Sequence, residues 1–329
     1  MLKGAVLGYG NMGRQLTRRI NSSSRFDARV VATCDILEAN RATARRAGLR
    51  VIEDPTDLQA EALDFVIVSS TTDAHAEQVI AAADAGCHIF CEKPVALSLD
   101  EADRMVAATE SRNLVTVVNY ITRFNPGYQY LHRLVESGEV GNVLSIVHHR
   151  LRGFGLFEAG ARHTAVLEPE RSGGWTVHHA CHDTDLLLWL GGAVNTAYGM
   201  TASTGAPSEE LVSALLRLES GAIAHIEDSV CGLREHYTRI IGSRASVVLT
   251  GENENSVCRV KREGREDEER VSVEDRKQPE AALAHFFDCI RDNQRSPVDL
   301  RSARKSLAVV LAIRRSAREG RPVTIPEYR

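Results

Sequence analysis

Lys93, which lies between Glu92 and Pro94, is the side chain in this sequence best placed to do chemistry. It follows the short apolar run 88–91, and a proline biases the residue before it toward extended backbone and away from helix. We therefore expect the Lys93 ammonium to be held at the end of a strand. An ammonium fixed there can hydrogen-bond a substrate oxygen or take part in a proton relay.

A glycine loop precedes Lys93 by about 80 residues and has the spacing of a dinucleotide-binding turn. Its first glycine permits a tight turn, its second lets a pyrophosphate approach the backbone, and its third lets a helix pack closely on a strand. Asp35 ends the next strand, where a carboxylate binds a ribose 2′-hydroxyl and repels a 2′-phosphate. The alternative is a glycine turn without a cofactor. We expect NAD rather than NADP, bound by Gly8, Gly10, Asn11, Met12, Gly13 and Asp35.

A second candidate set lies in residues 172–192, which predict a helix that ends at a pair of glycines. His178, His182 and Asp185 stand at positions i, i+4 and i+7, so they share one stripe of this helix. The two histidines also have zinc-ligand spacing beside Cys181. A helix turns Cys181 about 100° away from His182, so we expect no metal site.

Two patterns describe the elements that must position these groups. Through residue 122, short apolar strands alternate with helices, which is typical of a parallel sheet covered on both faces. After that residue, longer strands with alternating apolar residues predict a mostly antiparallel sheet with one face covered. The predicted fold class is α/β, with a doubly wound Rossmann domain over 1–122 and a second α/β domain with an open sheet over 123–329.

The composition is that of a soluble globular protein. The chain has 329 residues, of which 43% are hydrophobic and 26% charged, enough for two domains with proper cores. Its net charge of −4 argues against nucleic acid or an anionic membrane as a partner. No secretory start or membrane span is recognisable. The seven cysteines form no CxxC pair, so we expect reduced thiols in a cytoplasmic protein.

With these features the chain resembles the Gfo/Idh/MocA oxidoreductases, the glucose–fructose oxidoreductase and inositol dehydrogenase family. The matching segments are 64–75, 83–94 with its closing Glu-Lys-Pro, 119–126, 138–141 and 307–320. The resemblance implies a homodimer or homotetramer, and a catalytic Lys93 with a cis bond to Pro94. It also implies cofactor contacts from Ser70, Thr71, His75, Glu92, Lys93 and Asn119.

One position departs from the family pattern in the histidine helix. The family usually has an aspartate four residues before the histidine, and this chain has His178 there. A neutral His178 could still exchange one hydrogen bond, whereas a charged one would lower the pKa of His182. In the predicted reaction Lys93 hydrogen-bonds the reacting oxygen and His182 removes its proton. His178 tunes His182, and Tyr120 closes the pocket or shares the relay.

The substrate side is predicted from a basic stripe on strand 143–152. Ile146, His148, Arg150 and Arg152 share one face there because side chains alternate along a strand. Such a stripe is usually solvated or paired with carboxylates, but in this family the open sheet can border the substrate pocket. The predicted ligands of an acidic or heavily hydroxylated substrate are Arg123, Arg150, Arg152, Arg162 and Asp185, and the last could instead only orient His182.

The predicted activity is NAD-dependent hydride transfer to or from a carbinol of a sugar, polyol or sugar derivative. One alternative is an NAD-dependent glycosidase that works by transient oxidation, elimination and re-reduction. Another is a non-catalytic NAD-binding sensor. Release of an aglycone without net NADH would indicate the glycosidase, and tight NAD binding without turnover would indicate the sensor.

Overall fold

The computed structural model describes residues 1–153, 168–251, 256–273 and 280–325, and the chain forms two compact units. The first comprises Met1–Tyr120 and Pro279–Arg304, and the second comprises Ile121–Gln278 and Lys305–Arg329. A segment near the C-terminus thus groups with the first unit, although the sequence pattern assigned everything after residue 122 to the second. The functional boundary at residue 122 stays a prediction.

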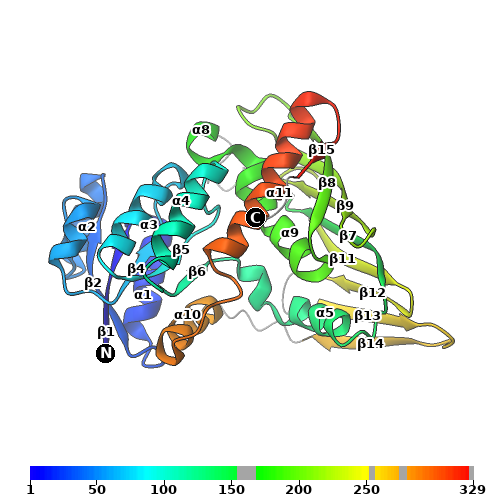
Figure 1. Ribbon diagram of the computed structural model, residues 1–329, viewed down its shortest axis with the longest axis horizontal. Helices are drawn as coiled ribbons and strands as arrows, with labels where there is room; N and C mark the ends of the chain where they lie inside the picture. The colour runs from blue at the N-terminus through cyan, green and yellow to red at the C-terminus, as the bar shows by residue number, and fades with distance from the viewer. Residues whose placement is uncertain (154–167, 252–255, 274–279, 326–329) are drawn as a thin grey trace. The chain divides into compact units, whose positions relative to one another are not determined.

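The first unit contains the parallel sheet that the strand–helix alternation predicts. Its six strands run in the order β3-β2-β1-β4-β5-β6, and neighbouring strands pair in parallel. The order reverses direction at β1, so right-handed crossovers place the helices after β1 and after β4 on opposite faces. Figure 1 shows helices on both sides of this sheet. The strands are β1 (Leu2–Leu7), β2 (Ala28–Cys34), β3 (Arg50–Val51), β4 (Phe65–Val68), β5 (His88–Cys91) and β6 (Thr116–Val118).

The helices of this unit alternate with its strands, as the sequence pattern predicts. Four of them are α1 (Asn11–Ser22), α2 (Glu38–Arg46), α3 (His75–Asp84) and α4 (Leu99–Glu110), with short 3-10 segments at Pro55–Ala60 and Thr72–Ala74. Ser98 caps α4 by accepting a hydrogen bond from the backbone N–H of Glu101, whose side chain in turn accepts from the backbone N–H of Ser98. This reciprocal arrangement satisfies two donors at the helix end and explains why α4 begins there.

Helix α10 (Ala281–Asp292) joins the first unit through two phenylalanines. The Phe287 ring centroid lies 5.2 Å from that of Phe26 and 5.1 Å from that of Phe65. The Phe286 ring centroid lies 5.7 Å from that of Phe90. The apolar face of α10 is therefore buried against the parallel sheet. The local sequence cannot say which sheet this helix covers.

The second unit contains a nine-stranded sheet in the order β14-β13-β12-β11-β7-β10-β9-β8-β15. Its described strand pairs are antiparallel except β7 with β10, which confirms the mostly antiparallel sheet. The strands are β7 (Val143–Leu151), β8 (Val194–Ala202), β9 (Leu211–Leu218), β10 (Ile223–Ser229), β11 (Glu235–Gly242), β12 (Ala245–Thr250), β13 (Ser256–Arg262), β14 (Glu268–Val273) and β15 (Val323–Thr324).

Helices cover one face of this sheet, as the alternating strands predict. Figure 1 shows α5 and α9 on that face, and both helices contact it. Strands β8, β13, β14 and β15 are absent from the sequence-based assignment, because glycine, threonine and charged residues interrupt their apolar pattern. The helices of this unit are α5 (Pro126–Glu136), α8 (Pro169–Ser172), α9 (Gly174–Gly191) and α11 (Leu300–Glu319), whose first turn belongs to the first unit.

Helix α9 is the element that carries the candidate histidines. It begins after Gly173, whose φ of +84° favours glycine, and it ends at Gly191 as the glycine pair predicts. The loop between β8 and β9 caps its first turn, because the Ser208 hydroxyl accepts from the Trp175 N–H at 2.9 Å. The helix is buried on most sides, so its orientation is set by packing rather than by its own sequence.

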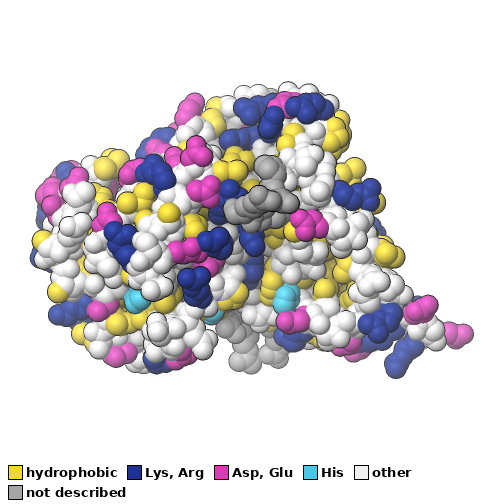
Figure 2. Space-filling model, viewed as in Figure 1, with side chains coloured by type: hydrophobic (Ala, Val, Ile, Leu, Met, Phe, Trp, Pro, Cys, Tyr) yellow, Lys and Arg dark blue, Asp and Glu magenta, His cyan; other side chains and the backbone are white. Residues whose placement is uncertain are grey.

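The surface carries charges of both signs. Figure 2 shows Lys and Arg side chains interspersed with Asp and Glu over the visible face, which agrees with the small net charge. Within the described part of the chain, we find no helix both long enough and apolar enough to span a bilayer.

Candidate functional site

The glycine loop of the first unit leaves room for a phosphate group. A Cβ on Gly8 would lie 2.5 Å from the Ser70 backbone nitrogen, and one on Gly13 would lie 2.1 Å from the Gly8 carbonyl oxygen. Both positions therefore require glycine for close packing. A Cβ on Gly10 would meet nothing within 4 Å, so the backbone is open where α1 begins with Asn11 and Met12. The free N–H groups and dipole of that helix end favour a phosphate.

Asp35 is fixed beside this loop by hydrogen bonds from the backbone. Its Oδ2 accepts from the Tyr9 N–H at 2.6 Å and from the Asn40 amide at 3.0 Å, and its Oδ1 accepts from the Leu37 N–H at 2.8 Å. A carboxylate can accept about four hydrogen bonds, so Asp35 retains capacity for a ribose hydroxyl. The loop and Asp35 together fit an adenine dinucleotide without a 2′-phosphate.

The Glu-Lys-Pro turn lies at the carboxyl end of β5, and the Lys93–Pro94 bond is cis, as the resemblance implies. Glu92 is buried, and its Oε1 accepts from the Asn119 amide at 2.7 Å. Burial raises the pKa of Glu92, and the Asn119 hydrogen bond partly opposes that rise. Lys93 is half-buried beside this pair. Ligands of open parallel sheets bind outside the carboxyl ends of the strands, which is where Lys93 lies.

His75 contacts the same turn from the interior of the unit rather than from the surface. It is buried, with its Nδ1 2.9 Å from the Pro94 carbonyl oxygen and its Nε2 3.3 Å from the Ser70 carbonyl oxygen. Burial lowers the pKa of His75, so the ring is neutral and has one N–H to donate. We assign that hydrogen bond to Pro94, the shorter contact. Ser70 and Thr71 are half-buried at the end of β4, and Tyr120 is buried after β6.

The second unit holds a cavity of about 320 Å³, within the range of small-molecule sites. His182 of α9 reaches its wall. Six of its ten described lining residues are arginine or histidine, one is aliphatic, and none carries a carboxylate. The cavity is thus polar and lined mainly by basic side chains. Its described lining consists of Ile121, Thr122, Asn125, Tyr128, His148, Arg150, Arg152, His182, Arg234 and His236.

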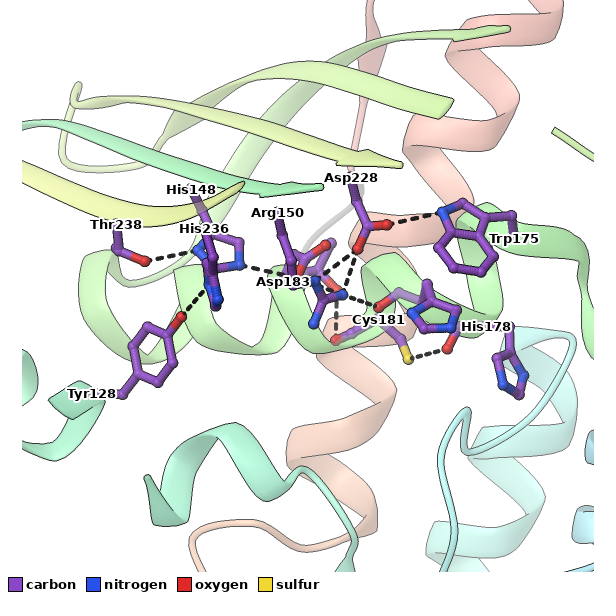
Figure 3. A network of polar contacts seen from close by, with 12 residues as sticks. Tyr128, His148, Arg150, Trp175, His178, Cys181, Asp183, Asp228, His236 and Thr238 are labelled. Carbon is purple, nitrogen blue, oxygen red and sulfur yellow. Dashed lines mark hydrogen bonds and ion pairs between the residues drawn. The ribbon is translucent and has the colours of Figure 1, made fainter. Parts of the chain in front are cut away.

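Arg150, one of these lining residues, is held in a buried ion-pair network (Figure 3). Its Nε donates to Asp228 at 2.8 Å, and one terminal nitrogen lies 2.8 Å from Asp183 and 2.9 Å from the His179 carbonyl oxygen. Trp175 donates its indole N–H to Asp228 at 2.9 Å. Burial raises the pKa of Asp228 to about 6, with Arg150 opposing the rise and Asp183 adding to it. Two carboxyl groups therefore fix Arg150 in one position.

Two further pairs border the cavity beside this network (Figure 3). His148 lies between the Thr238 hydroxyl, 2.8 Å from its Nδ1, and Asp183, 3.1 Å from its Nε2. The Tyr128 hydroxyl lies 2.6 Å from His236 Nε2. The cavity therefore carries a tyrosine–histidine pair in addition to His182, and each of these groups can transfer a proton.

The remaining predicted residues are placed differently. Arg123 forms two hydrogen bonds of 2.7 Å with the buried carboxylate of Asp185, and neither residue lines the cavity. Their contact with a substrate stays a prediction. His178 is half-buried one helical turn before His182. Arg162 lies outside the described residues. Those that are described contain no group of three His, Cys, Asp or Glu side chains arranged to hold a metal ion.

Sequence reasoning missed Tyr128, Arg234 and His236, and also the two aspartates that hold Arg150. A signal for part of this set exists in β11, where the polar residues His236 and Thr238 share one face, as His148 and Arg150 do in β7. In the structure the two strands are antiparallel neighbours, with His236 opposite Arg150. Two adjacent strands with polar residues on the covered face indicate a buried polar site.

Comparison with known proteins agrees with this architecture. Residues 2–120 match the oxidoreductase family with an NAD-binding Rossmann fold, and residues 132–325 match the C-terminal α/β domain of the same family. A scyllo-inositol 2-dehydrogenase (NAD(+)) from Bacillus subtilis is 27% identical over 98% of this chain and 95% of its own. A 2,7-anhydro-N-acetylneuraminate hydratase from Escherichia coli is 28% identical over 76% of this chain and 68% of its own.

A solved structure shares the whole fold. An oxidoreductase from Agrobacterium radiobacter, in complex with NAD+, L-tartaric acid and magnesium, superposes with a TM-score of 0.86 over 98% of each chain, at 22% identity. The two family matches between them span nearly all of the sequence, from residue 2 to residue 325. The chain therefore belongs to the Gfo/Idh/MocA family of NAD-binding oxidoreductases.

Proposed function

We propose that this protein is an NAD-dependent dehydrogenase of a sugar or polyol, with Lys93 and His182 as its catalytic groups. The observation that carries the proposal is the polar cavity with His182 in its wall. Relatives named for scyllo-inositol and 2,7-anhydro-N-acetylneuraminate support a substrate rich in hydroxyl groups. A panel of sugars, polyols and sugar acids, assayed for NADH formation, tests the proposal.

Each proposed residue has one task in this reaction. Bound NAD supplies the hydride acceptor. Lys93 hydrogen-bonds the reacting oxygen and stabilises the charge that develops on it. His182 takes the proton of the same hydroxyl as general base. His178 sets the protonation of His182, and Tyr120 supports the site from its buried position.

The His182→Gln variant should lower kcat by about a hundredfold or more. A base must be deprotonated to act, so wild-type kcat/KM should fall as pH drops below the pKa of this histidine. The variant should lose that acidic limb, with NAD affinity unchanged. The matched control is His225→Gln, on the opposite face of the same sheet. If the His182→Gln variant keeps the acidic limb of the pH profile, His182 is not the general base.

The Asp35→Asn variant should lower the preference for NAD over NADP by about tenfold or more, because a full charge near the 2′-phosphate is lost. The amide oxygen can still accept from the Tyr9 N–H, so the loop should keep its shape. Dissociation constants of both cofactors, measured by fluorescence titration, check this. The control is Glu53→Gln, which alters an exposed carboxylate after β3. An equal change of cofactor preference in both variants would contradict the role of Asp35 in selecting NAD.

The Tyr128–His236 pair favours a second candidate function, a redox-neutral elimination. In that reaction the carbinol is first oxidised to a ketone. A base then removes the proton on the neighbouring carbon, and a group on the next carbon leaves and takes up a proton. Hydride finally returns, so no NADH accumulates. This course needs an acid–base pair beyond His182, and the cavity supplies one. Release of a chromogenic aglycone without net NADH distinguishes it.

The outer face of the second sheet supports a homodimer or homotetramer. Tyr198, Met200, Leu215 and Ile223 lie on that face on three neighbouring strands, and Met200 is 59% exposed and Leu215 53% exposed. Apolar side chains gathered in this way are typical of a surface that another subunit covers. Light scattering measures the assembly. A cytoplasmic location stays part of the proposal.

The substrate that we favour is acidic. Three arginines and three histidines border the cavity, and none of its described lining residues is a carboxylate. A sugar acid or polyol acid would complement the basic character of these side chains better than a neutral sugar.

A further inference from the structure

Helix α9 is fastened to the covered face of the second sheet along one row of its residues. Trp175, His179 and Asp183 stand at i, i+4 and i+8, so they follow one ridge of the helix. Trp175 donates its indole N–H to Asp228 at 2.9 Å. Arg150 donates to the His179 carbonyl oxygen at 2.9 Å and lies 2.8 Å from the Asp183 carboxylate. Three successive turns of α9 thus meet the same Arg150–Asp228 pair (Figure 3).

The apolar residues of α9 do not by themselves select one rotation of the helix about its axis. Fourteen of its 18 residues are buried, on several sides of the helix. Burial of apolar surface is non-directional, so it fixes where the helix lies better than how it is turned. Hydrogen bonds depend on direction, and a wrong rotation would take Asp183 away from its buried cationic partner, which is costly. The polar row therefore selects the rotation.

Asp183 also fixes α9 along strand β7. Its Oδ1 lies 2.8 Å from a terminal nitrogen of Arg150 and 3.1 Å from Nε2 of His148, two residues of that strand. The Thr238 hydroxyl of β11 lies 2.8 Å from the other ring nitrogen of His148, so the contact is tied to the neighbouring strand as well. His148 and Arg150 both line the cavity. One carboxylate therefore connects the helix to the cavity wall.

The direction of His182 follows from the position of Asp183. The two residues are adjacent in α9, and successive residues of a helix differ in direction by about 100°. Holding Asp183 therefore holds the direction in which His182 projects into the cavity wall. A general base must lie within hydrogen-bond reach of the proton that it removes, and a misplacement of about 1 Å can cost about a hundredfold in rate.

We propose that Asp183 and Asp228, acting through Arg150, are positioning residues that fix the rotation of α9 and so aim His182 at the reacting hydroxyl. The inference rests on the proposed function, in which His182 is the general base. Both aspartates are buried, and neither belongs to the described lining of the cavity. They therefore act through their neighbours rather than on the substrate.

The kinetic test compares Asp183→Ala with Asp183→Asn in the NAD-loaded protein, with the best substrate of the sugar and polyol panel. Alanine removes both contacts of the carboxylate, so kcat should fall about 10- to 100-fold while KM and the affinity for NAD change little. Asparagine keeps an oxygen in the place of Oδ1 that can accept from Arg150 and His148, so it should restore most of kcat.

The pH profile separates positioning from an effect of charge. Removing a nearby negative charge lowers the pKa of an imidazole. A role of Asp183 through its charge would therefore move the acidic limb of kcat/KM to lower pH in both variants and leave the plateau rate unchanged, which would overturn the proposal. A positioning role instead lowers the plateau kcat in the alanine variant and spares the asparagine variant.

Leu216→Ala is the matched control for lost stability. Leu216 is buried on β9, and its apolar side chain takes no part in the polar row. Thermal unfolding ranks the variants, and Leu216→Ala should keep the wild-type kcat even where its unfolding midpoint falls. An equal loss of kcat in this control would overturn the positioning role.

Trp175→Phe tests the same row if Asp183→Ala does not fold. It removes the donor to Asp228 and keeps an aromatic ring against His179, with which Trp175 stacks at a centroid distance of 3.7 Å. It should lower kcat by about tenfold with KM little changed. A wild-type kcat in this variant would contradict the proposal.

Crystal structures of the wild type, Asp183→Ala and Asp183→Asn give a readout that does not depend on turnover. The His182 ring should move by about 1 Å or more in the alanine variant and stay in place in the asparagine variant. If no sugar or polyol is turned over, the proposed function fails and these structures alone decide the positioning role. Wild-type turnover with an unchanged plateau kcat in folded Asp183→Ala, or an unmoved His182 ring, would overturn that role and leave the dehydrogenase intact.

Discussion

The Lys93→Ala variant should lose about a thousandfold in kcat while its affinity for NAD stays close to that of the wild type. The ammonium is the proposed partner of the reacting oxygen, and no other side chain of the Glu-Lys-Pro turn can replace its positive charge. The turn itself should persist. Its backbone is held by the hydrogen bond from the Glu92 N–H to Val68 and by the Glu92–Asn119 contact, neither of which involves the lysine side chain.

Cofactor fluorescence measures the affinity for NAD, and steady-state NADH formation measures kcat. Lys261→Ala removes an exposed lysine on β13 and serves as the control. Glu92→Gln is an informative companion, since it keeps the shape of the turn and removes only a buried carboxyl group. Turnover near the wild-type rate in Lys93→Ala would refute the catalytic role, and a parallel loss of NAD binding would indicate a cofactor ligand instead.

The Arg150→Met variant should lose about 3–5 kcal/mol of unfolding free energy at neutral pH. Methionine fills similar space but leaves Asp183 and Asp228 together without their shared cation, and both are buried. Removing one partner of a buried ion pair leaves charge that neither water nor protein compensates. Arg217→Met, an exposed arginine on β9, should cost little by comparison.

The loss of unfolding free energy in Arg150→Met should depend on pH in a defined direction. Asp228 already has a folded-state pKa of about 6, above its ordinary value, because of burial. A group that binds its proton more tightly in the folded state contributes stability at low pH, and that contribution is lost as pH rises through the folded pKa. Without Arg150 this pKa should rise further, so the deficit should be smaller at acidic than at neutral pH.

Chemical denaturation at two pH values measures this deficit. The Arg150→Met/Asp228→Asn double variant should regain part of the stability, since one of the two charges is gone. A deficit that is the same at both pH values, or a double variant no more stable than the single one, would show that Arg150 does not act through these carboxylates.

Much of the cofactor side could be predicted because its signals are local. A Cβ on Gly8 or Gly13 would clash with neighbouring backbone, whereas Gly10 leaves the end of the helix open. Each role follows from the spacing of the glycines along one turn. Continuous apolar residues predict β4, and all four of them are buried. The histidine helix is likewise marked by its terminal glycines. Its His182 reaches the cavity, as its place on the stripe with His178 allows.

The sequence by itself determined the fold class, the cofactor type and the position of Lys93 at a strand end, because residues near one another in the chain encode strands, turns and helix ends. Tertiary structure alone decided which charged groups meet around the cavity that His182 lines. Arg150 meets Asp228 across 78 residues, and Tyr128 meets His236 across 108. Such pairs depend on strand order and register, which local sequence does not specify. Arg150 of the basic stripe therefore met its buried counterion Asp228 only once β7 and β10 were neighbours.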